Sequence, residues 1–67
     1  MKAYMLREQM YEGYWADQFV FNAKDERDAQ SKAWGWGRYH SFIQDDIKVR
    51  PATEQEAATR MHNEYIF

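Results

Sequence analysis

The order of apolar and polar residues predicts that the chain begins with a β-strand. Over residues 3–11 the side chains alternate, with Tyr4 and Leu6 on one face and Met5 on the other. Gly13 then marks a tight turn, because glycine adopts positive φ without steric cost.

A second strand is predicted over residues 14–22, which are rich in aromatic side chains. Strict alternation would place Trp15, Asp17, Phe19 and Phe21 on one common face. Two such runs around a glycine turn predict a β-hairpin.

The period then changes to that of a helix. Asp25 is a suitable N-cap, since its carboxylate can accept the free amides of the first turn. Ala29, Ala33 and Trp36 follow the i, i+4, i+7 spacing of an inner helix face. Two glycines in the last turns place the helix end within residues 34–39.

A third strand and a second helix complete the pattern. Residues 47–50 alternate between apolar and basic side chains, and Pro51 ends the strand because it has no amide hydrogen to donate. Thr53 and Glu56 form a capping box, which predicts a helix over residues 53–64. Its expected apolar stripe is Ala57, Ala58, Met61 and Tyr65.

These elements, in the order ββαβα, predict an α+β fold. We expect a three-stranded antiparallel sheet, built from the hairpin and the returning third strand, with two helices packed against it. At 67 residues and 8.2 kDa, the sequence predicts a single domain over residues 1–67.

The amino-acid composition indicates that the surface carries aromatic rings. Mean hydropathy is low, at -0.95, yet 18% of the residues are aromatic. A domain of this size buries only about 60% of its unfolded surface, and each ring has about 150–250 Å² to bury. We therefore expect some rings to be exposed and to act as binding anchors. The alternative is that the tyrosines only lie at the edge of the core, with their hydroxyl groups in water.

The net charge and the lack of cysteine restrict the classes of partner and the cellular compartment that we expect. The net charge of -2 gives no overall basic footprint for duplex nucleic acid, and there is no cysteine for a disulfide or a thiolate zinc site. Apolar runs are too short for a membrane span, and charge appears too early for a signal peptide. We expect a cytoplasmic protein that does not bind membranes.

Candidate catalytic and metal-binding residues all have simpler structural explanations. His40 and His62 would need Asp45 or Glu64 to complete a zinc site, and no metal-binding spacing is present. The clustered carboxylates fit helix N-termini or a turn. These are Asp25, Glu26 and Asp28, then Asp45 and Asp46, then Glu54 and Glu56. We expect no enzyme activity, metal or cofactor.

The most unusual stretch is residues 34–42, which hold four rings, one arginine and one histidine without an acidic residue. It could be a stacking surface for unpaired bases with Arg38 on phosphate, or a protein-binding surface. Alternatively, Trp36 and Phe42 close the core. The candidate partner-binding residues are Trp15, Trp34, Trp36, Arg38, Tyr39 and Arg50.

About half of the chain resembles a known family. Residues 19–23, the alanines Ala29 and Ala33, and the strand of residues 47–51 are similar to the small podovirus inhibitor of bacterial RNA polymerase. The resemblance implies a three-stranded sheet with one helix, action by binding a polymerase cleft, and Arg50 as a contact residue. In size and composition the chain also resembles phage anti-defence proteins, including anti-CRISPR proteins.

From this we expect a binding protein that inhibits a larger host protein or nucleoprotein complex by occupying a surface, as a monomer or homodimer. The alternative is a single-stranded nucleic-acid-binding protein with an aromatic platform. A small accessory enzyme is a third possibility, and it would need a pocket with at least two convergent titratable groups.

Overall fold

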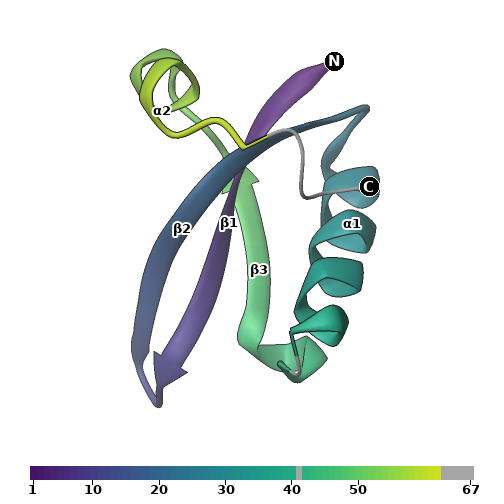
Figure 1. The fold of residues 1–67 in the computed structure, drawn as a ribbon, viewed down its shortest axis with the longest axis vertical. Coiled ribbons are helices and arrows are strands. Elements are labelled where there is room, and N and C mark those ends of the chain that lie inside the picture. Colours follow the sequence, from purple (N-terminus) through teal and green to yellow (C-terminus); the bar gives the residue numbers. More distant parts are fainter. Residues whose placement is uncertain (41, 63–67) are drawn as a thin grey trace.

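The computed structural model describes residues 1–40 and 42–62 and has the predicted α+β architecture (Figure 1). All three strands are antiparallel and lie in the order β2-β1-β3. The predicted order ββαβα is confirmed, with one short 3₁₀ helix, η1, added before β3. The elements are β1 (Lys2–Tyr11), β2 (Tyr14–Ala23), α1 (Glu26–Tyr39), η1 (Gln44–Asp46), β3 (Ile47–Pro51) and α2 (Glu54–Thr59).

The hairpin of β1 and β2 turns at Gly13, whose φ is 85°, as the glycine signal predicted. The predicted alternation along β2 is wrong, because a β-bulge interrupts the pairing. Leu6 pairs with Phe19, whereas the next residue, Arg7, pairs with Asp17. Neighbouring residues of β1 point to opposite faces, so Phe19 and Asp17 do as well. The bulge thus separates the polar half of β2 from its apolar half.

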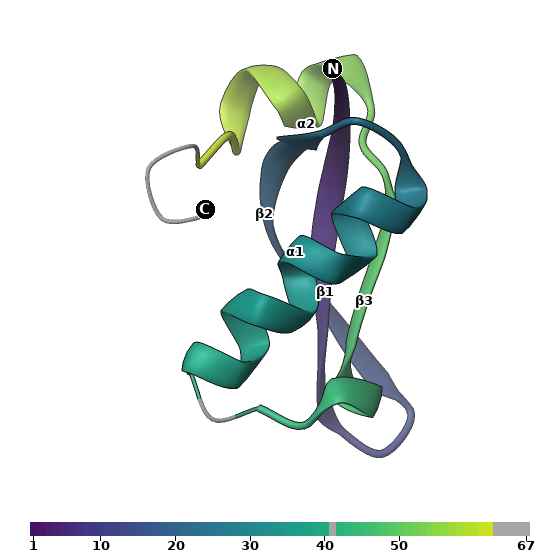
Figure 2. The ribbon, with the colours of Figure 1, turned by 90° about the vertical axis from the view of Figure 1, so that its right-hand side faces the viewer.

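Helix α1 covers one face of the sheet, running along β3 (Figure 2). Its start is as predicted, since the Asp25 carboxylate accepts the amide of Asp28 at 2.8 Å. The residues that it buries are all small, namely Ala29, Ala33 and Gly37. Small side chains at this spacing allow the helix backbone to approach the sheet closely.

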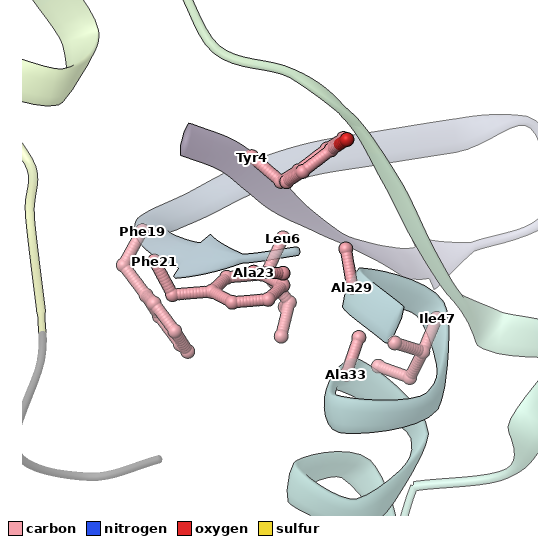
Figure 3. Packing of buried hydrophobic residues seen from close by; sticks show 8 residues of the cluster. All are labelled: Tyr4, Leu6, Phe19, Phe21, Ala23, Ala29, Ala33 and Ile47. Atoms are coloured by element: carbon pink, nitrogen blue, oxygen red, sulfur yellow. The ribbon is translucent and has the colours of Figure 1, made fainter. Parts of the chain in front are cut away.

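The main core lies between α1 and the sheet (Figure 3). Trp34, Trp36 and Val49 pack against its edge and stay partly exposed. The eight buried members of the core are Tyr4, Leu6, Phe19, Phe21, Ala23, Ala29, Ala33 and Ile47.

Helix α2 packs on the other face of the sheet, against β1 and β2. The capping box of Thr53 and Glu56 is present, but the helix ends at Thr59, so the prediction that it extends to residue 64 is wrong. The chain leaves the helix to pair with the edge of β2. Val20 donates its amide to the carbonyl of Arg60 and accepts the amide of His62, each at 2.8 Å.

This pairing also corrects the predicted apolar stripe of the second helix. Met61 forms a β-bridge with Val20 instead of a helix contact, and Ala58 is exposed. Tyr65 lies outside the described residues. No helix in the described parts of the chain is long and apolar enough to cross a membrane.

The close approach of α1 predicts opposite effects for alanine at its two glycines. A Cβ on Gly37 would lie 2.9 Å from Cγ1 of the buried Ile47, whereas one on Gly35 would meet nothing within 4 Å. Gly37→Ala should lower the free energy of unfolding by about 1–2 kcal/mol, because overpacking outweighs the gain in helix propensity. Gly35→Ala should raise it by up to about 1 kcal/mol. Urea denaturation of both variants measures the difference, and equal stabilisation by both would contradict the close packing.

Candidate functional site

The exposed large apolar side chains are concentrated at one end of the molecule. Apart from Met1, those in the described residues fall in two segments, residues 10–14 and 39–43. The hairpin turn and the loop after α1 both lie at the end of the domain away from α2 and the N-terminus (Figures 1 and 2). We call this surface the apolar end. It consists of Met10, Tyr11, Tyr14, Tyr39, Phe42 and Ile43.

The hairpin tip provides half of the apolar end. Tyr11 and Tyr14 flank the turn and stack on each other, with ring centroids 5.1 Å apart and planes at 14°. The stack leaves Tyr11 68% exposed, and Met10 is 54% exposed. A rigid pair of rings on a projecting hairpin can enter an interface with little further loss of conformational freedom.

The loop after α1 provides the other half. The amide of Phe42 donates to the carbonyl of Gly37 at 2.7 Å, and its ring stacks on Trp36 with centroids 5.7 Å apart. Tyr39 is 85% exposed and Ile43 is 64% exposed.

A polar contact links the two halves. Gln9 Nε2, at the end of β1, donates to Asp46 Oδ1 of η1 at 3.0 Å. The hairpin and the loop after α1 are thereby fixed relative to each other.

Glu8 is a buried carboxylate close to this contact. Glu8 is only 6% exposed, and its Oε1 accepts a hydrogen bond from Gln18 Nε2 at 3.0 Å. Burial raises the pKa of Glu8, the charge of Asp46 raises it further, and His40 partly offsets both. The ionised form of Glu8 is therefore a cost to the fold at neutral pH.

The predicted site residues of α1 have mixed environments. Trp34 and Trp36 are partly buried against the core, with the Trp36 ring edge-on to Phe19 at 5.4 Å. Arg38 and Tyr39 are exposed at the end of the helix. The two indoles therefore pack against the core, and the exposed rings of this region are those of Tyr39 and Phe42.

The other two predicted residues lie on the opposite face of the sheet. Trp15 pairs with Gln9, and Arg50 pairs with Met5, on the face turned away from α1. The six predicted residues thus do not form one site. The expectation that some rings are exposed is confirmed, but the rings concerned are mainly tyrosines.

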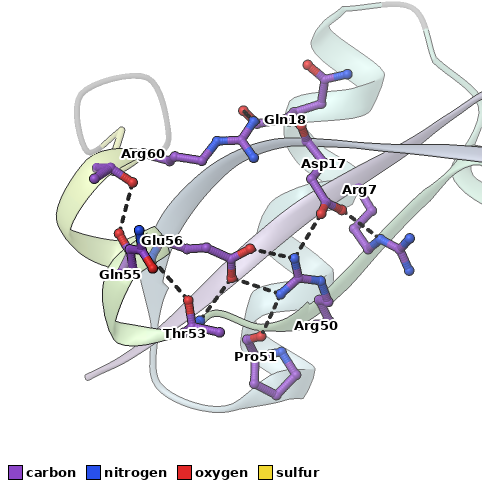
Figure 4. Close-up of polar contacts among 10 residues, drawn as sticks. Arg7, Asp17, Gln18, Arg50, Pro51, Thr53, Gln55, Glu56 and Arg60 are labelled. Carbon is purple, nitrogen blue, oxygen red and sulfur yellow. Dashed lines mark hydrogen bonds and ion pairs between the residues drawn. The ribbon is translucent and has the colours of Figure 1, made fainter.

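Arg50 is held in an intramolecular clamp (Figure 4). Its Nη2 donates to Glu56 Oε2 at 2.7 Å and to Asp17 Oδ2 at 2.8 Å, and its Nη1 donates to Glu56 Oε1 at 3.0 Å. Asp17 also accepts Arg7 Nε at 2.9 Å. The clamp joins β3, β2 and α2, so Arg50 serves the fold in this structure.

The clamp shifts the pKa of each partner. The hydrogen bond from Arg50, with the amide of Thr53, lowers the pKa of Glu56 to about 2. Burial alone would raise the pKa of Asp17, but hydrogen bonds from Arg50 and Arg7 outweigh it and lower that pKa. The same two carboxylates raise the pKa of Arg50.

The histidines and carboxylates of the described residues do not gather into a metal site. Within residues 1–40 and 42–62, no group of three or more histidine, aspartate or glutamate side chains could hold a metal ion. Both His40 and His62 are exposed. Glu64, considered above as a ligand, lies outside the described residues.

No protein-family model, curated protein or solved structure matches this chain. The resemblance to the podovirus inhibitor and to phage anti-defence proteins therefore stays a prediction.

Sequence reasoning missed most of the apolar end. Tyr39 is the one member of the apolar end among the candidate residues. The apolar side chains beside the hairpin turn look like the end of a buried strand, and Phe42 looks like part of the core. The signal that could have found the hairpin residues is the pair of tyrosines flanking Glu12 and Gly13, which puts rings at the tip of a hairpin.

The clamp predicts a specific dependence of stability on pH. The pKa of Glu56 falls from its ordinary value of 4.5 to about 2, so its stabilising effect is complete above pH 4.5 and is lost as the pH falls towards 2. Glu56→Gln should lower the melting temperature at pH 7 and flatten the acid limb of the stability profile.

Glu54→Gln is the matched control, since Glu54 occupies the same helical turn and forms no ion pair in the described residues. Thermal denaturation from pH 7 to pH 2 checks both variants. An acid limb in Glu56→Gln parallel to that of the wild type would contradict the clamp.

Glu8 should have the opposite effect on how stability changes with pH. Because its pKa is raised, the ionised carboxylate destabilises the fold above that pKa, and the cost disappears as the pH falls to the ordinary value of 4.5. Glu8→Gln should therefore melt at a higher temperature than the wild type at pH 7, with the two converging near pH 4. Calorimetry at both pH values measures this, and a lower melting temperature at pH 7 would show that ionised Glu8 is stabilising.

Proposed function

We propose that this protein is a non-catalytic binding module whose apolar end docks on the surface of a larger protein. One observation carries the proposal: six of the seven exposed large apolar side chains among the described residues lie in two segments at one end of the domain. Scattered exposed apolar residues are normal, but their concentration in one place is typical of an interaction surface. Tyrosine is also among the preferred residues at the energetic centres of interfaces.

The charges beside the apolar end favour a protein partner over nucleic acid. Glu12 lies in the hairpin turn, and Asp45 and Asp46 follow Ile43. None of these three carboxylates takes part in an ion pair within the described residues. They outnumber Arg38, the exposed arginine beside Tyr39, so on balance this end would repel phosphates and complement lysine and arginine side chains.

The same charges argue against a second copy as the main partner. A two-fold symmetric contact places the same patch of each copy against the other. The unpaired carboxylates of one apolar end would then face those of its twin. A different protein with basic side chains around an apolar surface fits better.

We further propose that docking inhibits a host protein or nucleoprotein machine, by covering a surface that the machine needs. This part rests on the resemblance to phage inhibitors. The experiment below tests the docking surface itself.

The test compares proteins captured from a lysate of the natural host cell. We expect the wild type to retain a specific protein that the double variant Tyr11→Ser/Ile43→Ser loses, since losing two interface anchors weakens binding by about 2–4 kcal/mol. Both residues are more than 60% exposed, so the variant should fold, which circular dichroism checks.

Ala58→Ser is the matched control, because it makes an exposed position more polar on α2, at the other end of the domain. Retention of the same proteins by wild type, control and double variant would exclude the apolar end as the docking surface. Mass spectrometry identifies the retained proteins.

A further inference from the structure

The sheet face opposite α1 is covered only in part. Helix α2 packs against β1 and β2 on this face, and the paired residues Met5 and Val20 on the same face are fully buried. Towards the hairpin turn, the same face carries Arg7, Trp15 and Lys48. We call these three residues the sheet patch. Helix α2 lies at the other end of the sheet (Figure 1).

The members of the sheet patch are neighbours across the strands. Arg7 of β1 pairs directly with Lys48 of β3, and Lys48 Nζ lies 4.7 Å from the ring centre of Trp15. Lys48 is exposed, and Arg7 and Trp15 are partly exposed. Two cations and one indole therefore lie side by side on this face.

This face is basic although the whole chain carries a net charge of -2. Asp17 is shared between Arg7 and Arg50, and Glu56 is occupied by Arg50. Arg60 also lies at its edge, where its Nη2 donates to the carbonyls of Asp17 and Gln18 at 2.8 and 3.1 Å. Among the described residues, the polar contacts of this face involve four cations and two carboxylates, and both carboxylates are already paired. The cations are Arg7, Lys48, Arg50 and Arg60.

Arg7 has unused hydrogen-bonding capacity. A guanidinium has five N–H donors, and the Arg7 side chain forms a single hydrogen bond within the described residues, from Nε to Asp17. Asp17 fixes the position of this guanidinium, and its two terminal nitrogens stay available to an anion.

We infer that the sheet patch binds single-stranded nucleic acid, with an unpaired base on Trp15 and phosphates at Arg7 and Lys48. A ring beside cations on an open surface is the combination by which proteins hold unpaired strands, since bases stack on rings and phosphates pair with cations. Because Lys48 is exposed, its ammonium can turn from the indole to a phosphate when a base arrives. A duplex keeps its bases stacked and would leave the indole unused, as would an acidic peptide. This site is independent of the apolar end.

The test measures the fluorescence anisotropy of a labelled oligothymidine of about 10 nucleotides, titrated with the intact protein. We expect binding at low salt, which weakens about sevenfold between 50 and 200 mM salt if two phosphates are neutralised. Trp15→Ala should weaken binding at least about fivefold. Lys48→Gln should weaken it and reduce the salt dependence by about half.

Tyr14→Ala is the matched control, since Tyr14 adjoins Trp15 in β2 but belongs to the apolar end. It should bind like the wild type, and circular dichroism of all variants checks folding. Lys48→Gln changes an exposed side chain, so this variant should fold. It therefore still tests the sheet patch if Trp15→Ala does not fold.

Three results would overturn the inference. The first is no binding of oligothymidine at low salt, and the second is unchanged binding by both Trp15→Ala and Lys48→Gln. The third is displacement of the oligonucleotide by an equal charge of polyglutamate, which would identify the patch as a site for acidic protein. None of these results bears on capture through the apolar end, so the two proposals fail separately.

Discussion

The arrangement of this protein depends on how closely α1 lies against the sheet. Ala29, Ala33 and Gly37 form the contact, and a single added carbon at Gly37 would collide with Ile47. The large rings beneath the helix come from the sheet, namely Tyr4, Phe19 and Phe21, and the helix itself contributes only small residues there. Trp34 and Trp36 are therefore held at the edge of the core, and the rings of Tyr39 and Phe42 lie at or beyond the end of the helix, where they form half of the apolar end.

On the opposite face of the sheet, ion pairs fix the position of α2. The Arg50 clamp ties α2 to β2 and β3 (Figure 4). The helix therefore lies at the end of that face away from the hairpin turn (Figure 1). Because the clamp uses Asp17 and Glu56, the carboxylates that contact Arg7 and Arg50 are already paired. One small domain thus carries an apolar end with unpaired carboxylates and, on a separate face, a basic patch with an indole.

Much of the fold could be predicted because its signals are local. The cap at Asp25, the capping box at Thr53 and the turn at Gly13 each depend on residues within four positions of one another. Other features could not be predicted in this way. The bulge in β2 depends on its pairing with β1, and α2 ends early because residues 60–62 pair with the edge of β2 instead of extending the helix.

By itself, the sequence determined the order and type of the elements and the excess of rings over what so small a core can bury. Periodicity and capping are properties of short segments, and the ring count is a property of composition. Only the tertiary structure decided which rings are exposed and what Arg50 contacts. Its partner Asp17 is 33 positions away, and the bulge that turns Asp17 towards Arg50 exists only once β1 and β2 have paired. Exposure and charge pairing are set by distances in space, which periodicity along the chain does not encode.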